Sequence, residues 1–180
     1  MMLNGDCMAK TNHLLIVADA GPLIHLDELS ALDVLSDYAA VLVPNAVWLE
    51  VQQHRPQALL KINVKVIRQT TPTASDRVNA IAALYTLHHG EREALELCLT
   101  HSVNLLITDD TAARLAAKSM NIETHGTLGL LIRSVRQQLR QPSEVLTLLA
   151  AIPEQTTLHI RPSLLNEVVA QVAEEWKSKP

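Results

Sequence analysis

The sequence predicts an α/β protein with three layers, α/β/α, in which helices cover both faces of a central, mostly parallel sheet. Two observations predict this fold class. Short apolar runs of strand length alternate with longer segments whose apolar residues recur at helical spacing. The runs at 14–18 and 104–107 are apolar without alternation, which is typical of strands buried on both faces of a parallel sheet. Extra helices are expected at the C-terminal end.

Length and composition limit the classes of protein that the chain can belong to. Its 180 residues fit one domain with a small appendage, which we divide into a core domain at 1–140 and a helical extension packed on it at 141–180. With two Trp, two Tyr and no Phe, the chain lacks the rings of an aromatic platform for single-stranded nucleic acid. The net charge of −4 means that a nucleic-acid partner must use a local basic patch.

The cysteine content and the N-terminal stretch indicate the cellular compartment of the protein. Cys7 and Cys98 are too few for a disulfide framework and lack the spacing of zinc ligands. Residues 1–10 lack the basic start and apolar run of a signal peptide, and the run at Leu14 is too short to span a bilayer. We therefore expect a cytoplasmic protein without membrane association.

The first predicted strand, 14–18, ends on a single carboxylate, Asp19. Gly21 and Pro22 then turn the chain into a helix predicted from Leu23 to Leu35. Ligands of open parallel sheets bind at the carboxyl ends of strands, so Asp19 lies where chemistry is expected. Two interpretations remain open, because an Asp at this position is either a helix cap or a catalytic ligand.

The second predicted strand, 40–43, leads into a helix capped by Asn45. Glu50 lies three to four residues after Ala46 and Val47, on the face that should meet the sheet. This position favours a functional carboxylate over a solvated one. A third strand at 64–67 alternates like a strand with one solvated face. The basic residues around it favour a solubilising edge, with phosphate contact as the alternative.

A helix predicted at 76–88 is followed by another that begins near Gly90. In the second of these helices Glu93 lies on one stripe with Ala94 and Cys98, so it is a carboxylate within an apolar face. Glu96 falls instead on the face of Arg92 and is expected to be solvated. Glu93 is therefore the candidate functional residue of this helix.

The apolar run at 104–107 repeats the opening pattern, since it ends on Thr108, Asp109 and Asp110. Adjacent aspartates can cap the helix predicted at 111–119, but two in a row exceed what capping requires. This acidic strand end is the strongest local signal in the sequence.

The remaining segments are a last short strand at 120–124 and three helices. The helix predicted at 127–139 is basic on one side, and this edge is a candidate RNA contact through Arg133, Arg136 and Arg140. Helices at 142–151 and 164–176 complete the chain. The last is amphipathic, a candidate surface for a partner or a second copy, and we expect a homodimer.

The chemistry-bearing residues are all oxygen donors. The chain has no glycine-rich phosphate loop, nucleophile elbow or HExxH pattern, which excludes those enzyme classes. The remaining candidates are Asp19, Glu50, Glu93, Thr108, Asp109 and Asp110. Hard oxygen ligands select Mg²⁺ or Mn²⁺ over zinc, and such ions activate water for attack on a phosphodiester.

In order, these pieces resemble the PIN-domain nucleases, in particular an uncharacterised branch related to VapC-type toxins. The matching segments are Val17 to Ile24, Val43-Pro44 with Val47 to Glu50, Gly90 to Ala94, Leu105 to Asp110 with Arg114, and Thr124 to Gly129. The resemblance implies an acidic metal-binding quartet of Asp19, Glu50, Glu93 and Asp110, assisted by Thr108 or Asp109. The third carboxylate is Glu where many relatives have Asp, and the chain after Arg140 lies outside the shared core.

The resemblance also implies an activity, that of a Mg²⁺- or Mn²⁺-dependent endoribonuclease, a hydrolase whose substrate is RNA. An antitoxin protein is then a candidate partner. The competing hypothesis is a PIN-like protein with weak or no catalysis that acts as an interaction module through its C-terminal helices. An aspartyl phosphatase or receiver domain is disfavoured, because Gly21 stands where those proteins place a second Asp.

Overall fold

The computed structural model describes residues 14–177, and its central sheet confirms the predicted fold class. Five strands pair in the order β3-β2-β1-β4-β5, and every pairing is parallel. The strands are β1 (Leu15–Ala18), β2 (Ala40–Pro44), β3 (Lys65–Gln69), β4 (Leu105–Ile107) and β5 (Glu123–His125). Cys7 and the stretch searched for a targeting signal lie outside the described residues.

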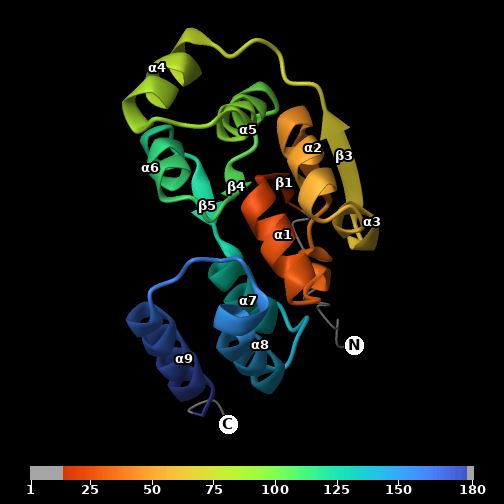
Figure 1. The fold of residues 1–180 in the computed structure, drawn as a ribbon, viewed down its shortest axis with the longest axis vertical. Coiled ribbons are helices and arrows are strands. Elements are labelled where there is room, and N and C mark those ends of the chain that lie inside the picture. The colour runs from red at the N-terminus through yellow and green to blue at the C-terminus, as the bar shows by residue number, and fades with distance from the viewer. Residues whose placement is uncertain (1–13, 178–180) are drawn as a thin grey trace, which may run out of the picture.

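Helices cover both faces of the sheet (Figure 1). They are α1 (Ala20–Glu28), α2 (Asn45–His54), α3 (Ala58–Lys61), α4 (Asp76–Tyr85), α5 (His89–Thr100), α6 (Thr111–Ser119), α7 (Thr127–Arg136), α8 (Pro142–Gln155) and α9 (Pro162–Lys177), with a 3₁₀ turn at Leu32–Leu35. None of the described helices is long and apolar enough to cross a membrane.

The side chains of β1 divide the core into two layers. Ile16 and Ala18 belong to an apolar cluster that includes side chains of α1, α2, α7 and α8. Val17, which points to the opposite face of the sheet, belongs to a second cluster with side chains of α4, α5 and α6. A strand buried in this way has no polar face, which explains why its sequence shows no alternation.

Several predicted element details differ from the structure. The helix predicted from Leu23 to Leu35 is two elements, because α1 ends at Glu28 and Ser30 adopts a left-handed φ of 53° before the 3₁₀ turn. Asn45 does not cap α2: its side chain accepts hydrogen bonds from the Arg68 guanidinium instead. These turns depend on contacts between segments distant in sequence, which local patterns do not reveal.

The C-terminal helices pack on the rest of the molecule. Val145 and Leu149 of α8 are fully buried and belong to the same apolar cluster as Ile16 of β1. In the linker that joins α8 to α9, Thr157 donates its backbone N–H to Glu28 of α1 over 2.9 Å. Figure 1 shows α8 and α9 beside α7, at the end of the molecule remote from α4.

Candidate functional site

The candidate site lies where the carboxyl ends of β1 and β4 meet. The Asp19 N–H donates to the carbonyl of Ile107 over 2.9 Å, which holds the two strand ends together. The Asp19 carboxylate accepts from the Ala20 N–H on one oxygen and from the Thr108 hydroxyl on the other, both over 2.8 Å. Asp19 therefore caps α1, and the buried Thr108 fixes its second oxygen.

The surroundings of Asp19 disfavour its charge. Burial raises the pKa of Asp19 to about 6, although the hydrogen bonds from Thr108 and Ala20 lower it. The carboxylates of Glu91 and Glu50 act in the same direction as burial. A carboxylate placed among other carboxylates at a strand end is the pattern of a functional site rather than of a cap alone.

Glu91 is a member of this acidic group that sequence reasoning missed. It lies in the first turn of α5, is 9% exposed and accepts from the His88 N–H over 2.7 Å. Burial raises the pKa of Glu91, and the neighbouring Asp110 and Glu50 raise it further. Its position after Gly90 was the available signal, but acidic residues are common in a first helical turn.

Glu93, the predicted quartet member of α5, has different contacts. Its carboxylate accepts from the Ala46 N–H over 2.8 Å, at the beginning of α2, and lies 3.4 Å from the His89 ring. The first residues of α2 receive no side-chain cap from Pro44, so Glu93 satisfies a donor that would otherwise lack a partner. The charges of Glu50 and Glu91 raise the pKa of Asp19, and those of Asp110 and Glu50 raise the pKa of Glu91, so Glu91 lies among the predicted quartet members Asp19, Glu50 and Asp110. The place of Glu93 in the quartet stays a prediction.

Gly90 allows the close approach of α2 to α5 at this point. A Cβ at Gly90 would lie 3.2 Å from the Val47 side chain and 4.0 Å from a carboxylate oxygen of Glu50. The glycine therefore makes room for the helix that carries Glu50 next to the turn that carries Glu91.

The two adjacent aspartates after β4 have separate roles. Asp109 accepts from the backbone and hydroxyl of Thr127 and contacts the His25 ring over 2.8 Å, so it ties β4 to α7 and α1. A Cβ at Gly126 would lie only 2.6 Å from Asp109, so this contact requires glycine there. Asp110 is exposed and caps α6 by accepting from the Ala113 N–H over 2.7 Å.

The carboxylates of the site supply oxygen ligands of the kind that divalent cations bind. Among residues 14–177, no three Asp, Glu, His or Cys side chains are already arranged to hold a metal ion. Asp19 and Glu91 are fixed by hydrogen bonds, whereas Glu50 and Asp110 are exposed at the edge of the site. Four carboxylates fit a hard cation such as Mg²⁺ or Mn²⁺ in chemistry, because these ions prefer oxygen ligands.

Arg133 and Arg140, two of the arginines predicted to contact RNA, form ion pairs within the protein. Arg133 forms a two-pronged ion pair with Asp37 and lies over the Tyr38 ring. The Arg140 Nε donates to Asp33 over 2.9 Å. Both pairs hold the end of α7 to the segment after α1. The Arg136 side chain is exposed.

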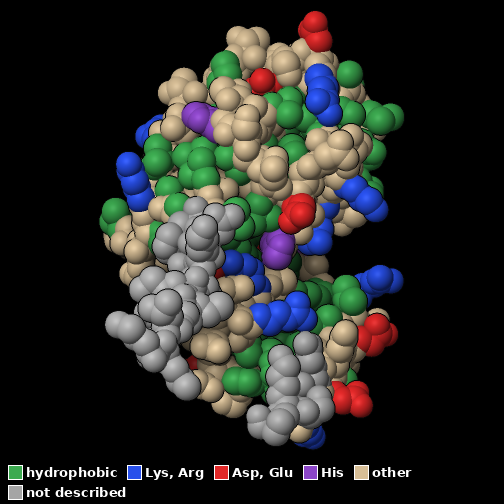
Figure 2. Space-filling model, turned by 180° about the vertical axis from the view of Figure 1, so that it is seen from behind, with side chains coloured by type: hydrophobic (Ala, Val, Ile, Leu, Met, Phe, Trp, Pro, Cys, Tyr) green, Lys and Arg blue, Asp and Glu red, His purple; other side chains and the backbone are tan. Residues whose placement is uncertain are grey.

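Charge on the surface follows the acidic composition. On the face drawn in Figure 2, Lys and Arg side chains are scattered among acidic and neutral ones rather than gathered in one broad basic surface. Contacts to an anionic polymer therefore depend on small local groups of cations.

The parallel sheet with acidic residues at its strand ends defines a class of α/β proteins, and comparison with known families places the chain within it. A PIN-domain family model matches residues 15–174. The chain therefore belongs to the PIN-domain family, whose members are generally nucleases. Comparisons with curated proteins and with solved structures found no match.

Proposed function

We propose that this protein is a metal-dependent endoribonuclease whose site is formed by Asp19, Glu50, Glu91 and Asp110. The observation that carries the proposal is the half-buried Asp19 carboxylate, whose pKa is raised at the meeting point of two strand ends. A bound Mg²⁺ or Mn²⁺ would supply the positive charge that polarises a water molecule and a phosphodiester oxygen.

Neighbouring hydrogen-bond donors position the carboxylates of Asp19 and Glu91. The hydroxyl of Thr108 and the N–H of Ala20 each hold one oxygen of Asp19, so its orientation is set before substrate arrives. The His88 N–H holds Glu91 in the same way. Glu50 and Asp110 are exposed, and they form the side of the site that RNA would approach.

Cleavage of RNA by an Asp19→Asn variant tests the assignment directly. Wild type and variant are incubated with mixed single-stranded RNAs in Mn²⁺, and separately in EDTA. We expect cleavage only by the wild type and only with Mn²⁺, with equal circular dichroism spectra for the two proteins. Equal cleavage by both proteins would exclude Asp19 from the reaction.

The competing function is an interaction module with weak or no catalysis, acting through the C-terminal helices. It is favoured by the lack, among the described side chains, of three carboxylates arranged at once around one position. Failure of the wild type to cleave any of many RNAs in Mg²⁺ or Mn²⁺ would support it.

We further propose the biological role of a toxin controlled by an antitoxin protein, on the basis of the resemblance to VapC-type toxins. Expression of the wild type should then stop growth, while Asp19→Asn should not. Co-expression of the protein encoded next to this gene should restore growth. A homodimer formed through α9 is part of the same proposal, and the molar mass in solution tests it.

A further inference from the structure

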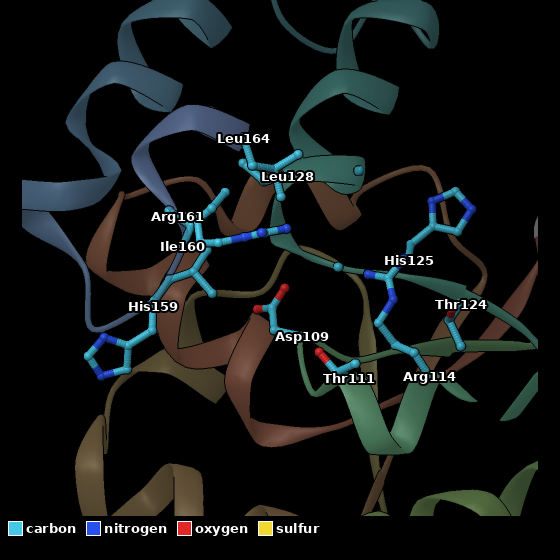
Figure 3. Close-up of a pocket in the computed structure, with 13 residues that line it drawn as sticks. Asp109, Thr111, Arg114, Thr124, His125, Leu128, His159, Ile160, Arg161 and Leu164 are labelled. Carbon is cyan, nitrogen blue, oxygen red and sulfur yellow. The ribbon is translucent and has the colours of Figure 1, made fainter. Parts of the chain in front are cut away.

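A cavity of about 640 Å³ lies beside the acidic group, on the β5 side of the sheet. Its wall comes from three parts of the chain: the turn after β4, the junction of β5 with α7, and the linker between α8 and α9 (Figure 3). Asp109 and Thr111 line it, and they flank Asp110 in sequence. The cavity therefore lies at the same end of β4 as Asp110.

Two guanidinium groups point into this cavity from opposite sides. Figure 3 shows Arg114 reaching in from α6 and Arg161 reaching in from the linker, while the His159 ring points away. Neither guanidinium forms a hydrogen bond or an ion pair with any residue that the structure describes. Charged side chains that converge without protein partners are available to a ligand.

The charges around the cavity add up to a small positive value. Asp109 is the one acidic side chain that lines the cavity among the described residues, and its oxygens already accept from Thr127 and His25. His125 also lines it, and burial, Arg133 and Arg114 lower its pKa, which disfavours its charged form. Two arginines and one aspartate leave a net charge that matches the single charge of a phosphodiester.

The remaining wall is apolar. It is formed by side chains of α7, the linker and the start of α9, namely Leu128, Leu158, Ile160 and Leu164. An apolar wall facing two guanidinium groups has the make-up of a nucleotide site, in which the ribose and base pack on one side and the phosphate is held on the other. The volume lies within the range of small-molecule pockets, about 300–1,000 Å³.

We propose that this Arg114–Arg161 pocket binds one nucleotide of single-stranded RNA, next to the bond held at the acidic group. The statement that the cleaved bond lies next to this nucleotide depends on the proposed nuclease function. The statement that the pocket binds RNA does not depend on it. Because Arg161 belongs to the linker between α8 and α9, the C-terminal segment contributes directly to the RNA site. The two arginines also give an acidic protein the local basic patch that binding requires.

Binding of a fluorescent, mixed-sequence single-stranded RNA in EDTA, titrated with NaCl, tests the pocket without cleavage. The Arg114→Ala/Arg161→Ala double variant should bind about 10-fold more weakly or worse at low salt. Its log–log salt slope should fall by about 0.7, the value for one phosphate contact on a single strand. Arg77→Ala, an exposed arginine of α4, is the matched control and should bind like the wild type.

A second double variant distinguishes the effect of losing the two positive charges from the effect of losing the two guanidinium groups. Arg114→Lys/Arg161→Lys keeps both charges, so it should retain the wild-type salt slope with a smaller loss of affinity. Both arginines are exposed, so each double variant should melt within a few degrees of the wild type.

The outcomes distinguish the pocket from the catalytic proposal. If the alanine double variant kept the wild-type affinity and salt slope, the proposal that this pocket binds RNA would be wrong. An acidic segment of a protein partner would then be the candidate ligand of the pocket. Lost affinity with an unchanged slope would also overturn the proposal, because the contact would not be to phosphate. Arginine-dependent binding by a protein that never cleaves RNA in Mn²⁺ would uphold the pocket and refute the nuclease.

Discussion

Asp19 combines two roles that the sequence left as alternatives. Its carboxylate caps α1, and the charges of Glu91 and Glu50 disfavour its ionised form. A neutral side chain such as Asn could cap the helix without this electrostatic cost. In the folded protein the pKa of Asp19 rises from 3.8 to about 6. Lowering the pH through this range therefore stabilises the metal-free fold, because the folded state takes up the proton first.

An Asp19→Asn variant should melt higher than the wild type in EDTA at pH 7.5. The amide can still accept from Ala20 and removes the disfavoured charge, which corresponds to a gain on the order of 1–3 kcal/mol. The difference should shrink as the pH falls below about 6, where the wild-type carboxyl is neutral. Thermal melts at several pH values measure it. A lower melting temperature for the variant at every pH would show that the charged form is stabilised.

Glu91 and Glu93 allow a matched test of which acidic residue of α5 belongs to the site. Glu91→Gln and Glu93→Gln both keep the acceptor that each side chain uses, for His88 and Ala46 respectively. We expect Glu91→Gln to reduce Mn²⁺-dependent RNA cleavage to near background and Glu93→Gln to leave most of it. The reverse result would support the quartet predicted from the sequence, with Glu93 as its third member.

The reason why sequence reasoning preferred Glu93 lies in the packing of α5. This helix is covered on several sides, and Glu96, predicted to be solvated, is 7% exposed and accepts from Ser75. When a helix is buried nearly all round, apolar spacing no longer marks one inner face. Which of three glutamates meets Asp19 therefore depends on tertiary contacts.

At the level of elements, ion pairing within the protein is a structural role for the basic residues of α7 that does not involve RNA. Burial lowers the pKa of Arg133, but the hydrogen bonds from its guanidinium to Asp37 outweigh this and raise it, consistent with a firmly held pair. Arg133→Ala should destabilise the protein by about 1–2 kcal/mol.

For a chain of this size, that loss corresponds to a fall in melting temperature of about 2–8 °C. The salt slope of RNA binding should stay at the wild-type value, and the same titration on Arg136→Ala tests the exposed arginine of this edge. A flattened slope for Arg133→Ala at unchanged stability would return Arg133 to the RNA surface.

Strand positions were more predictable than helix ends. The β1 and β4 runs were recognised because a strand buried on both faces is uniformly apolar, and α6 begins and ends as predicted. By contrast, α4 was predicted to reach His88 but ends at Tyr85, where Thr86 adopts a left-handed φ of 58°. Its sequence offers no glycine at that position to mark the end.

At the level of the whole molecule, the apolar clusters join the predicted core domain to the predicted extension. Ile152 of α8 and Leu165 of α9 are nearly or fully buried in the cluster that also contains Ile16 and Leu23. The family match likewise continues through both parts, to residue 174. Apolar area shared in this way makes the stability of each part depend on the other.

Removal of residues 141–180 tests whether 1–140 folds alone. We expect the truncated chain to lose cooperative melting and to bind a hydrophobic dye, because deletion uncovers the surface that α8 covers. A milder control is Leu149→Ala in the full chain, which should cost about 2–5 kcal/mol and still fold, since Leu149 is fully buried. If the truncated chain melted cooperatively near the wild-type temperature, the core would be a self-sufficient domain. In that case the truncated chain, which lacks Arg161, should still bind RNA more weakly than the full chain.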